Sequence, residues 1–294
     1  MAGQDLDAVT ETLTARTGSR IMIDPDVALL ETIEAETAWD FQVYTPSDAV
    51  LRYGMTWARI GGGVALAVRD DTTGRGSRAL GFGATEPVTG ELVDSLIDFY
   101  RANGNSRATL QFAPSALPPD WDKIRARHGL TAGATHLKLS RSAGPVTPAT
   151  TGLRIAEVEV ERAELWASVM VRGFSMPAEQ LVPSVQNVAA RPGWTMFAAF
   201  EGDRMVAAAG LLIRGGIAEM TGASTLPGYR RQGAQSALLA ARIQKAAAGG
   251  ASLLSAETTK TEEGSRSISL NNLLRAGFEI RYERLDWNWR SQPS

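Results

Sequence analysis

The chain has 294 residues, is 44% hydrophobic and 21% charged, and carries a formal net charge of −2. This composition excludes a disordered or fibrous chain, and its 30 basic against 32 acidic residues provide no basic field for nucleic acid or an anionic membrane surface. The absence of cysteine excludes disulfides and thiolate nucleophiles, and with only two histidines we expect no metal site.

Targeting features are not expected either. The first seven residues are acidic and lack the basic-then-apolar order of a signal peptide. The longest apolar stretch, residues 206–213, is far shorter than the roughly 20 residues that span a bilayer. We therefore expect a cytoplasmic protein without membrane or nucleic-acid partners, and its preference for arginine over lysine is typical of a GC-rich bacterial genome.

The first half predicts an α+β order of elements. Residues 61–63 are glycines before an apolar strand over 64–68, which fits a hairpin bend better than a nucleotide loop. The elements expected after them are a turn at 83–87, a helix over 91–100, a strand over 108–112, a helix ending at 129–130 and a strand over 136–139.

A linker rich in Pro, Gly, Ser and Thr covers residues 142–152, near the midpoint of the chain. The second half then repeats the order of the first. The elements expected there are a strand from Ile217, a turn at 222–227, a helix with apolar residues between 234 and 245, a strand over 251–257, a short helix ending at 277–278 and a strand to Trp289.

The shared order predicts an internal duplication, with chance similarity of short turns as the alternative. The predicted domains are residues 1–143, a linker over 144–152, and residues 153–294.

The two halves differ in the loop before their first long helix. The second half has two arginines and Gly233 there, whereas the first half is shorter and has Glu91. The amides at a glycine-containing helix start bind phosphate, and an acidic side chain weakens such a site. This contrast predicts a pyrophosphate site in the second half alone. The alternative is a solvated arginine pair at an ordinary helix start.

Residues 227–239 resemble motif A of the GNAT superfamily of N-acetyltransferases, Q/R-x-x-G-x-G/A, with Arg230 and Gly233 in place and Gln235 departing from the last position. Residues 269–278 resemble motif B, with Asn272 five residues before the Gly-Phe pair and 39 residues after Gly233 (272 − 233). The resemblance covers residues 153–290 well and residues 30–141 faintly. It implies an α+β fold with two GNAT-like domains, each a mixed, mostly antiparallel central sheet flanked by helices, the N-terminal one a degenerate, structural copy.

The resemblance also implies acetyl-CoA as co-substrate, lying between two strands that splay apart and end at Leu226 and Glu257. The residues expected to bind it are Ser224, Thr225, Leu226, Arg230, Arg231, Gln232, Gly233, Ala234, Gln235, Ser236 and Asn272. The acetyl group would pass to an amine by direct attack, without a covalent enzyme intermediate.

Direct attack needs a general base. The first candidate is Glu219, on the strand before motif A, where GNAT enzymes that acetylate histones carry theirs; a salt-bridged structural glutamate is the alternative. Glu257 is the second candidate. The position of the usual tyrosine acid holds Leu273, which leaves Tyr282 as a weak candidate.

For the acceptor site we expect Phe174, Met176 and Trp194, although the acceptor itself is not identified by the sequence. The protein is expected to be an N-acetyltransferase for a small-molecule amine, acting as a monomer or homodimer in detoxification or self-resistance. The alternative is a non-catalytic acyl-CoA sensor or ligand-sequestering pseudoenzyme.

Overall fold

The computed structural model describes residues 23–71, 73–261 and 267–291. The chain divides into two compact units, the first formed by Met1–Lys138 with Tyr282–Ser294 and the second by Leu139–Arg281. The end of the chain is thus grouped with the first unit by its contacts. The boundaries expected from the sequence, 1–143 and 153–294, concern the repeated segments and remain a prediction.

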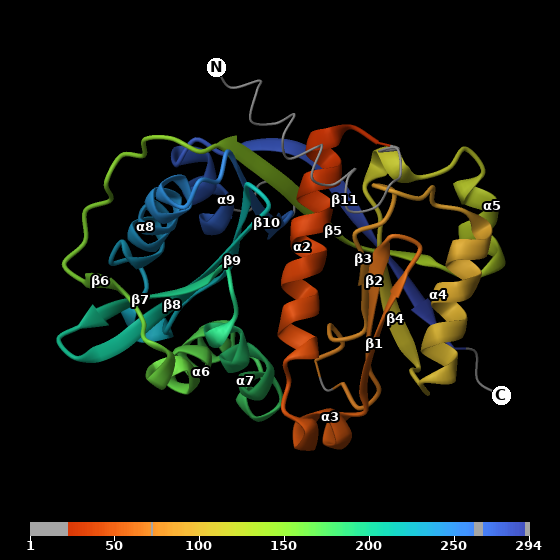
Figure 1. The fold of residues 1–294 in the computed structure, drawn as a ribbon, viewed down its shortest axis with the longest axis horizontal. Coiled ribbons are helices and arrows are strands. Elements are labelled where there is room, and N and C mark those ends of the chain that lie inside the picture. The colour runs from red at the N-terminus through yellow and green to blue at the C-terminus, as the bar shows by residue number, and fades with distance from the viewer. Residues whose placement is uncertain (1–22, 72, 262–266, 292–294) are drawn as a thin grey trace. The chain divides into compact units, whose positions relative to one another are not determined.

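The first unit contains helices and a mixed sheet (Figure 1). Its elements in chain order are α2 Pro25–Val43, α3 Ser47–Tyr53, β1 Met55–Ile60, β2 Gly63–Val68, β3 Arg78–Leu80, α4 Gly90–Ala102, β4 Arg107–Gln111, η1 Pro114–Ala116, α5 Trp121–Arg127 and β5 Thr131–Ser142. The sheet neighbours run β1-β2-β3-β4-β11-β5, where β11 is the last strand, Glu279–Arg290. Among the strand pairs of the first unit with a described register, only β3 and β4 are parallel.

The glycines at 61–63 form the hairpin turn between β1 and β2. Ile60 pairs with Gly63, and the two residues between them have φ of 52° and 79°. Two consecutive left-handed residues define the tight turn that matches strand twist, and glycine adopts them without steric cost. The predicted hairpin bend is confirmed.

Helix α4 anchors the core of the first unit. Its side chains Val93, Leu96 and Ile97 are buried together with Trp287 and Trp289 of β11. Every second side chain of a strand points to the same face, so the two tryptophans of β11 share one face and the even-numbered residues of this strand share the other. The last strand therefore contributes bulky side chains to this core.

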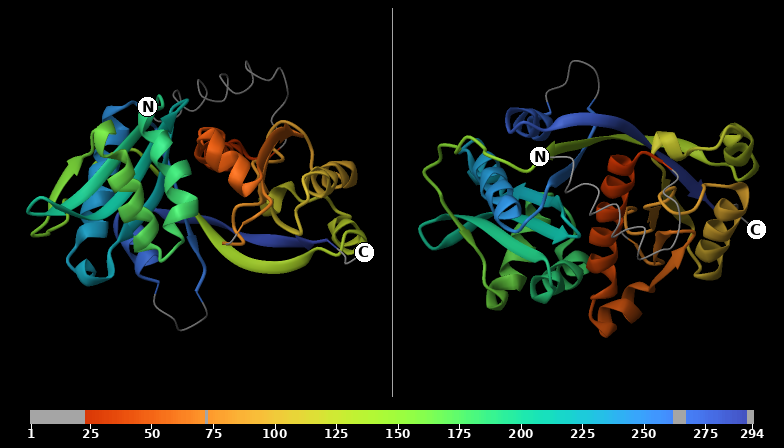
Figure 2. Two further views of the ribbon diagram at one scale, coloured as in Figure 1. Left: turned by 90° about the horizontal axis from the view of Figure 1, so that it is seen from below. Right: turned by 45° about the horizontal axis from the view of Figure 1, so that its top comes forward.

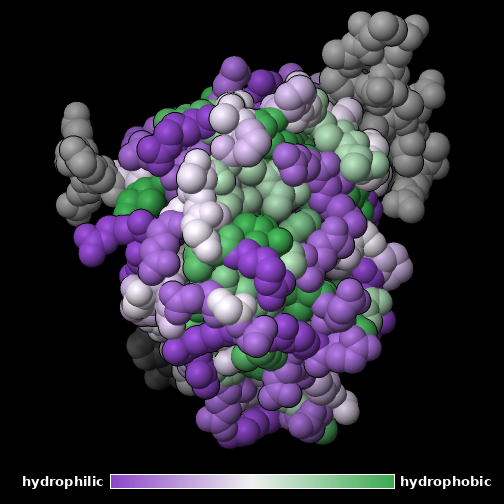
Figure 3. All heavy atoms as spheres, turned by 90° about the vertical axis from the view of Figure 1, so that its left-hand side faces the viewer, coloured by the Kyte–Doolittle hydropathy of each residue, from purple (hydrophilic) through white to green (hydrophobic). Residues whose placement is uncertain are grey.

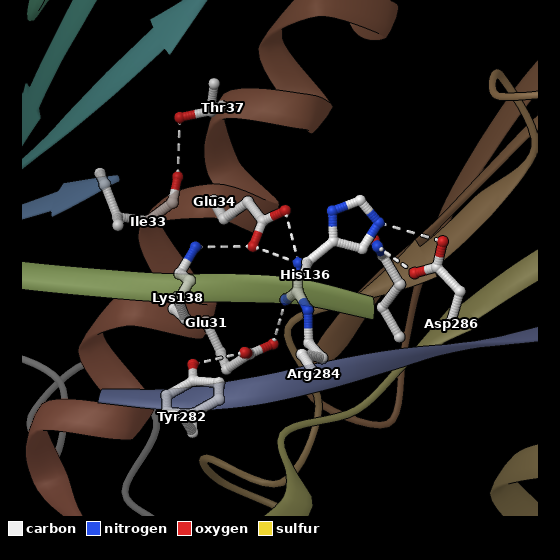
Figure 4. Close-up of polar contacts among 10 residues, drawn as sticks. Glu31, Ile33, Glu34, Thr37, His136, Lys138, Tyr282, Arg284 and Asp286 are labelled. Atoms are coloured by element: carbon white, nitrogen blue, oxygen red, sulfur yellow. Dashed lines mark hydrogen bonds and ion pairs between the residues drawn. The ribbon is translucent and has the colours of Figure 1, made fainter. Parts of the chain in front are cut away.

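The other face of β11 carries a polar cluster, formed with α2 and β5 by the buried Glu31, Glu34, Lys138 and Arg284 and the half-buried Tyr282 (Figure 4). The Arg284 guanidinium donates to Glu31 at 2.8 Å and to Glu34 at 2.7 Å, and Lys138 donates to Glu34 at 2.7 Å. Burial alone would raise the pKa of Glu34, but the positive charges of Arg284 and Lys138 outweigh it and hold this pKa below its ordinary value.

The second unit begins within β5 and is a sheet with helices on both faces. Its remaining elements are β6 Arg154–Glu157, η2 Val160–Arg162, α6 Ala163–Gly173, α7 Ala178–Gln186, η3 Asn187–Ala190, β7 Trp194–Glu201, β8 Arg204–Arg214, β9 Ile217–Thr225, η4 Pro227–Tyr229, α8 Ala234–Ala248, β10 Leu253–Thr259 and α9 Ile268–Arg275. The neighbours run β5-β10-β9-β8-β7-β6. Helices α6 and α7 cover one face, and α8 and α9 cover the other (Figure 1).

Strands β5 and β11 have residues in both units, and they run side by side in both views of Figure 2. On the face drawn in Figure 3, hydrophilic side chains cover most of the surface and apolar ones form smaller patches between them. None of the helices in the described part of the chain is both long and apolar enough to cross a membrane.

The fold is α+β, with mixed, mostly antiparallel sheets flanked by helices, as the sequence predicts. Both units place a helix between two parallel neighbouring strands: α4 between β3 and β4, and α8 between β9 and β10. The repeated order of elements is therefore present, although a duplication as its origin remains a hypothesis. The predicted strand over 136–139 is longer than expected, because β5 runs from Thr131 to Ser142.

Candidate active site

The candidate site lies where two parallel strands of the second unit part. The register of β9 and β10 runs from the pair Ile217–Leu253 to the pair Glu219–Ser255. Strand β9 continues six residues beyond its last pair (225 − 219), and β10 continues four (259 − 255). The adjacent β8–β9 ladder is irregular at the same level, where Gly222 has a φ of 62°. The strands therefore separate, as the resemblance implies.

A cavity of about 290 Å³ opens between these strands and the two helices that follow them. Its walls come from the end of α6, the separating parts of β9 and β10, and the facing sides of α8 and α9. The residues that line it are Phe174, Met220, Gly222, Ala223, Gln235, Leu239, Arg242, Ala256, Glu257, Thr258, Thr259, Ser269, Asn272 and Leu273. A concave site with apolar walls and a few polar groups is typical of a small-molecule pocket.

Residues 230–236, called the cofactor loop after the role that the resemblance implies, comprise the turn before α8 and the first residues of that helix. Gly233 is the N-cap with a φ of 81°, and no side chain caps this helix start. Arg231 also has a left-handed backbone, with a φ of 64°. The first amides of a helix lack intrahelical partners and carry the positive end of its dipole. No side chain at the start of α8 accepts a hydrogen bond from these amides, so side-chain capping does not compete with a ligand for them.

The segment that precedes β6 supports this loop. The hydroxyl of Thr151 donates to the carbonyl of Gln232 at 2.7 Å. A Cβ added to Gly233 would lie 2.6 Å from the carbonyl oxygen of Thr150. Gly233 is therefore required twice, once for its backbone angle and once for the close approach of residue 150.

Two predicted cofactor residues use their side chains to hold the loop in place. The Arg230 guanidinium donates to the carbonyl of Gly173 at 3.0 Å and to that of Thr225 at 3.3 Å. The hydroxyl of Ser224 donates to the carbonyl of Met170 at 2.8 Å. Both side chains tie the end of β9 and the cofactor loop to α6. A direct contact of either with a cofactor remains a prediction.

Asn272 joins the second motif to the first. Its Nδ2 donates to the Gln235 side chain at 2.9 Å, and its Oδ1 accepts from Ser236 at 3.3 Å and from Arg275 at 2.5 Å. Asn272 is buried and lines the cavity together with Gln235. The two motifs, 36 to 39 residues apart in the sequence, meet at one end of the cavity, which the sequence spacing alone does not reveal.

The two candidate bases occupy different positions. Glu257, two residues beyond the last β9–β10 pair, is half-buried and lines the cavity. Glu219 is 4% exposed and is followed directly by Met220, which lines the cavity, whereas Glu219 is not among the lining residues described. The structure therefore brings both carboxylates to the point where the strands part, one in the wall and one behind it.

Arg242 is a cavity residue that the sequence analysis missed. It lies on the buried side of α8, four residues after Leu238, and is 2% exposed. Burial lowers the pKa of Arg242 to about 10, and the negative charge of Glu219 opposes this shift. An arginine on an otherwise apolar helix face is the signal that could have identified it.

Of the three residues expected at the acceptor site, Phe174 lines the cavity and is 49% exposed. Met176 is half-buried beyond the end of α6, after Ser175 with its φ of 57°. Trp194 is buried in β7 and pairs with Leu212. Only Phe174 of these three belongs to the described lining.

The weak acid candidate, Tyr282, lies in the first unit, where its hydroxyl donates to Glu31 at 2.6 Å. Burial, followed by the negative charge of Glu31, raises the pKa of Tyr282 far above its ordinary value. The Tyr282 hydroxyl therefore uses its proton in the hydrogen bond to Glu31. The position of the usual tyrosine, Leu273, lines the cavity with an apolar side chain.

The corresponding helix start in the first unit differs from the cofactor loop. The hydroxyl of Thr89, the N-cap of α4, accepts from the amide of Leu92 at 3.2 Å. Hydrogen bonds from its own amide and from Thr89 hold the pKa of Glu91 below its ordinary value. The start of α4 thus contains a capping hydroxyl, from Thr89, and a carboxylate, from Glu91, whereas the start of α8 contains neither.

Comparison with known proteins agrees with the geometry of the second unit. Residues 164–278 match the acetyltransferase (GNAT) family. These residues form a GNAT domain. The match spans both motifs and the cavity between them, and the family implies acyl transfer from an acyl-CoA. No curated protein matches the chain.

Solved structures extend the fold to the rest of the chain. A GCN5-related N-acetyltransferase from Kribbella flavida is 21% identical with a TM-score of 0.58, and the match covers 89% of this chain and 97% of that one. One from Sphaerobacter thermophilus is 14% identical with a TM-score of 0.56 and coverages of 94% and 96%. A tandem GNAT protein from the clavulanic acid biosynthesis pathway is 16% identical with a TM-score of 0.56 and coverages of 100% and 97%. Because the sequence identities are low, the similarity to these structures supports a shared fold only.

Proposed function

We propose that this protein moves an acetyl group from acetyl-CoA to the amine of a small-molecule acceptor, by direct attack in a ternary complex. The observation that carries the proposal is the cavity between the separating strands of the GNAT domain, with Gln235 of motif A and Asn272 of motif B in its wall. We further infer a cytoplasmic monomer or homodimer. A role in detoxification or self-resistance rests on the GNAT resemblance.

The residues of the second unit fit acetyl-CoA. The uncapped start of α8 offers backbone donors and a helix dipole to a pyrophosphate, and Gly233, which adopts the positive φ, adds no side chain to the approach. Bound acetyl-CoA supplies an activated thioester. Because α4 is already capped by Thr89 and Glu91, a second pyrophosphate would have to displace a carboxylate. We therefore expect one cofactor per chain, held by the second unit.

The chain also offers two acceptors for the proton that the amine must lose. Glu219 is our proposed general base, reached through water because its carboxylate lies behind the cavity wall. Glu257, in the wall itself, is the second choice. A thiolate is a good leaving group, so solvent suffices as its proton donor where Leu273 replaces the usual tyrosine.

The absence of a tyrosine at position 273 also favours a second function, a non-catalytic acyl-CoA sensor or ligand-sequestering protein. The two functions make different demands on the cavity: an enzyme must admit an amine beside the thioester, whereas a sensor needs only the cofactor.

Release of free thiol from acetyl-CoA, measured across a panel of small amines, distinguishes the two. The proposal expects amine-dependent release with at least one acceptor. Thermal stabilisation by acetyl-CoA without release on any amine would favour the sensor. Neither stabilisation nor release would overturn both.

A further inference from the structure

Arg242 places a cation in the wall of the cavity. It is almost completely buried on α8, seven residues after Gln235, which corresponds to about 10 Å along a helix axis. Its charge therefore lies well away from the start of α8, where we propose that the pyrophosphate binds. The wall also contains the carboxylate of Glu257.

Backbone carbonyls hold the Arg242 side chain in a fixed position. Its Nε donates to Leu238 at 3.2 Å, and its Nη1 donates to Gly210 at 3.0 Å and to Thr221 at 3.3 Å. Gly210 and Thr221 are paired across the irregular part of the β8–β9 ladder. These three hydrogen bonds involve Nε and Nη1 of the guanidinium. The third nitrogen, Nη2, forms no hydrogen bond with the described residues.

The positive charge of Arg242 is only partly compensated. No ion pair joins it to a carboxylate among the described residues, and Glu219 affects it through its field. Its pKa of about 10 keeps the side chain charged at neutral pH. Burying a charge without a direct partner is costly, and a guanidinium recovers most when a planar anion binds to its remaining N–H groups.

We propose that Arg242 recognises a carboxylate in this cavity, carried either by the amine acceptor or by the acyl chain of the thioester. The inference rests on the proposed function and names the chemistry that the cavity selects. An acceptor with both an amine and a carboxylate fits a wall that holds one cation, Arg242, and one anion, Glu257. An acyl chain that ends in a carboxylate would meet the same guanidinium.

The test uses the unmodified protein and matched ligand pairs. In the first arm, binding of L-amino acids to the complex with free CoA, which has no acetyl group to transfer, is compared by calorimetry with binding of their α-amides, which keep the amine and lose the negative charge. In the second arm, succinyl-CoA is compared with butyryl-CoA. A hydrogen bond to a charged group predicts that the acidic member of one pair binds about 10- to 100-fold more tightly.

The arm that shows the preference identifies which substrate carries the carboxylate. Equal binding within both pairs would overturn the inference. Because acetyl-CoA binding and thiol release are measured separately, the proposed function could still stand after that result, and its own failure would be visible in those assays.

Two variants test the residue itself. Arg242→Gln should abolish the preference within the responsive pair, and Arg242→Lys should restore part of it, because an ammonium keeps the charge without the planar fork. As a matched control, Arg154→Gln removes an exposed arginine that stacks on Phe200 in the same unit and should leave the preference intact. A preference that survives Arg242→Gln would assign Arg242 to supporting the β8–β9 ladder only. If that variant does not fold, the ligand pairs on the unmodified protein decide.

Discussion

Replacement of Gly233 by alanine should weaken acetyl-CoA binding more than any other single-methyl change in the cofactor loop. The backbone at Gly233 has a φ of 81°, which costs a non-glycine residue about 1–2 kcal/mol. The added Cβ would also lie 2.6 Å from the carbonyl oxygen of Thr150, so that backbone must move. A shift of this backbone would weaken the 2.7 Å hydrogen bond from the Thr151 hydroxyl to the Gln232 carbonyl, which contributes about 1 kcal/mol.

Together these effects correspond to about 2–3 kcal/mol, or roughly a 30- to 150-fold loss of affinity if the loop reforms only on binding. Calorimetric titration of acetyl-CoA measures it directly. Gly228→Ala is the matched control, because a Cβ at Gly228 meets no atom within 4 Å and its φ is not left-handed. Equal affinities for Gly233→Ala and the unmodified protein would refute the assignment of the loop to the cofactor.

Three further outcomes are expected. Arg284→Met leaves the carboxylates of Glu31 and Glu34 buried without the guanidinium that pairs with them. This variant should lower the free energy of unfolding, measured by urea denaturation, by about 3–5 kcal/mol. A decrease of less than about 1 kcal/mol would contradict this. The pKa of Glu34 is lower in the folded than in the unfolded protein, so ionised Glu34 stabilises the fold fully above pH 4.5 and less as the pH falls below 4.5. A free energy of unfolding that stays constant from pH 5 to pH 3 would contradict this contribution of the buried cluster. Glu219→Gln should slow thiol release roughly 10²- to 10⁴-fold, less at high pH, while Glu257→Gln changes it little. A Glu219→Gln rate within a few-fold of that of the unmodified protein across pH would reassign Glu219 to structure.

The sequence predicts the GNAT part of the molecule well because its signals are local. Gly233, followed by a helix with regularly spaced apolar residues, indicates a glycine turn that opens α8, and both the turn and the helix are present. The two strands on either side of that helix separate as the same resemblance implies.

Helix α2 gave no comparable signal. Its buried residues include Glu31, Glu34 and Asp40, so its polar and apolar residues do not separate into two faces. The partners that make this burial favourable, Lys138 and Arg284, lie 104 to 253 residues away in the chain. A contact of that separation is determined by tertiary structure and not by the periodicity of the helix.

The candidate site shows the same division between local and distant information. The loop residues were identified from their motif, and Glu257 and Phe174 were expected from their positions near strand and helix ends. Arg242 was missed because an arginine among alanines and leucines is easily interpreted as the exposed side of a helix. Its burial depends on the carbonyls of Gly210 and Thr221, which belong to two other elements.

The number of acetyl-CoA molecules bound per chain tests the central claim most directly. The second unit has an uncapped helix start beside a cavity, whereas the corresponding helix of the first unit is capped by Thr89 and Glu91. Calorimetric titration of the full chain with acetyl-CoA should therefore give one site, and that site should be weakened by Gly233→Ala. Two equivalent sites, or a single site that Gly233→Ala leaves unchanged, would contradict the account.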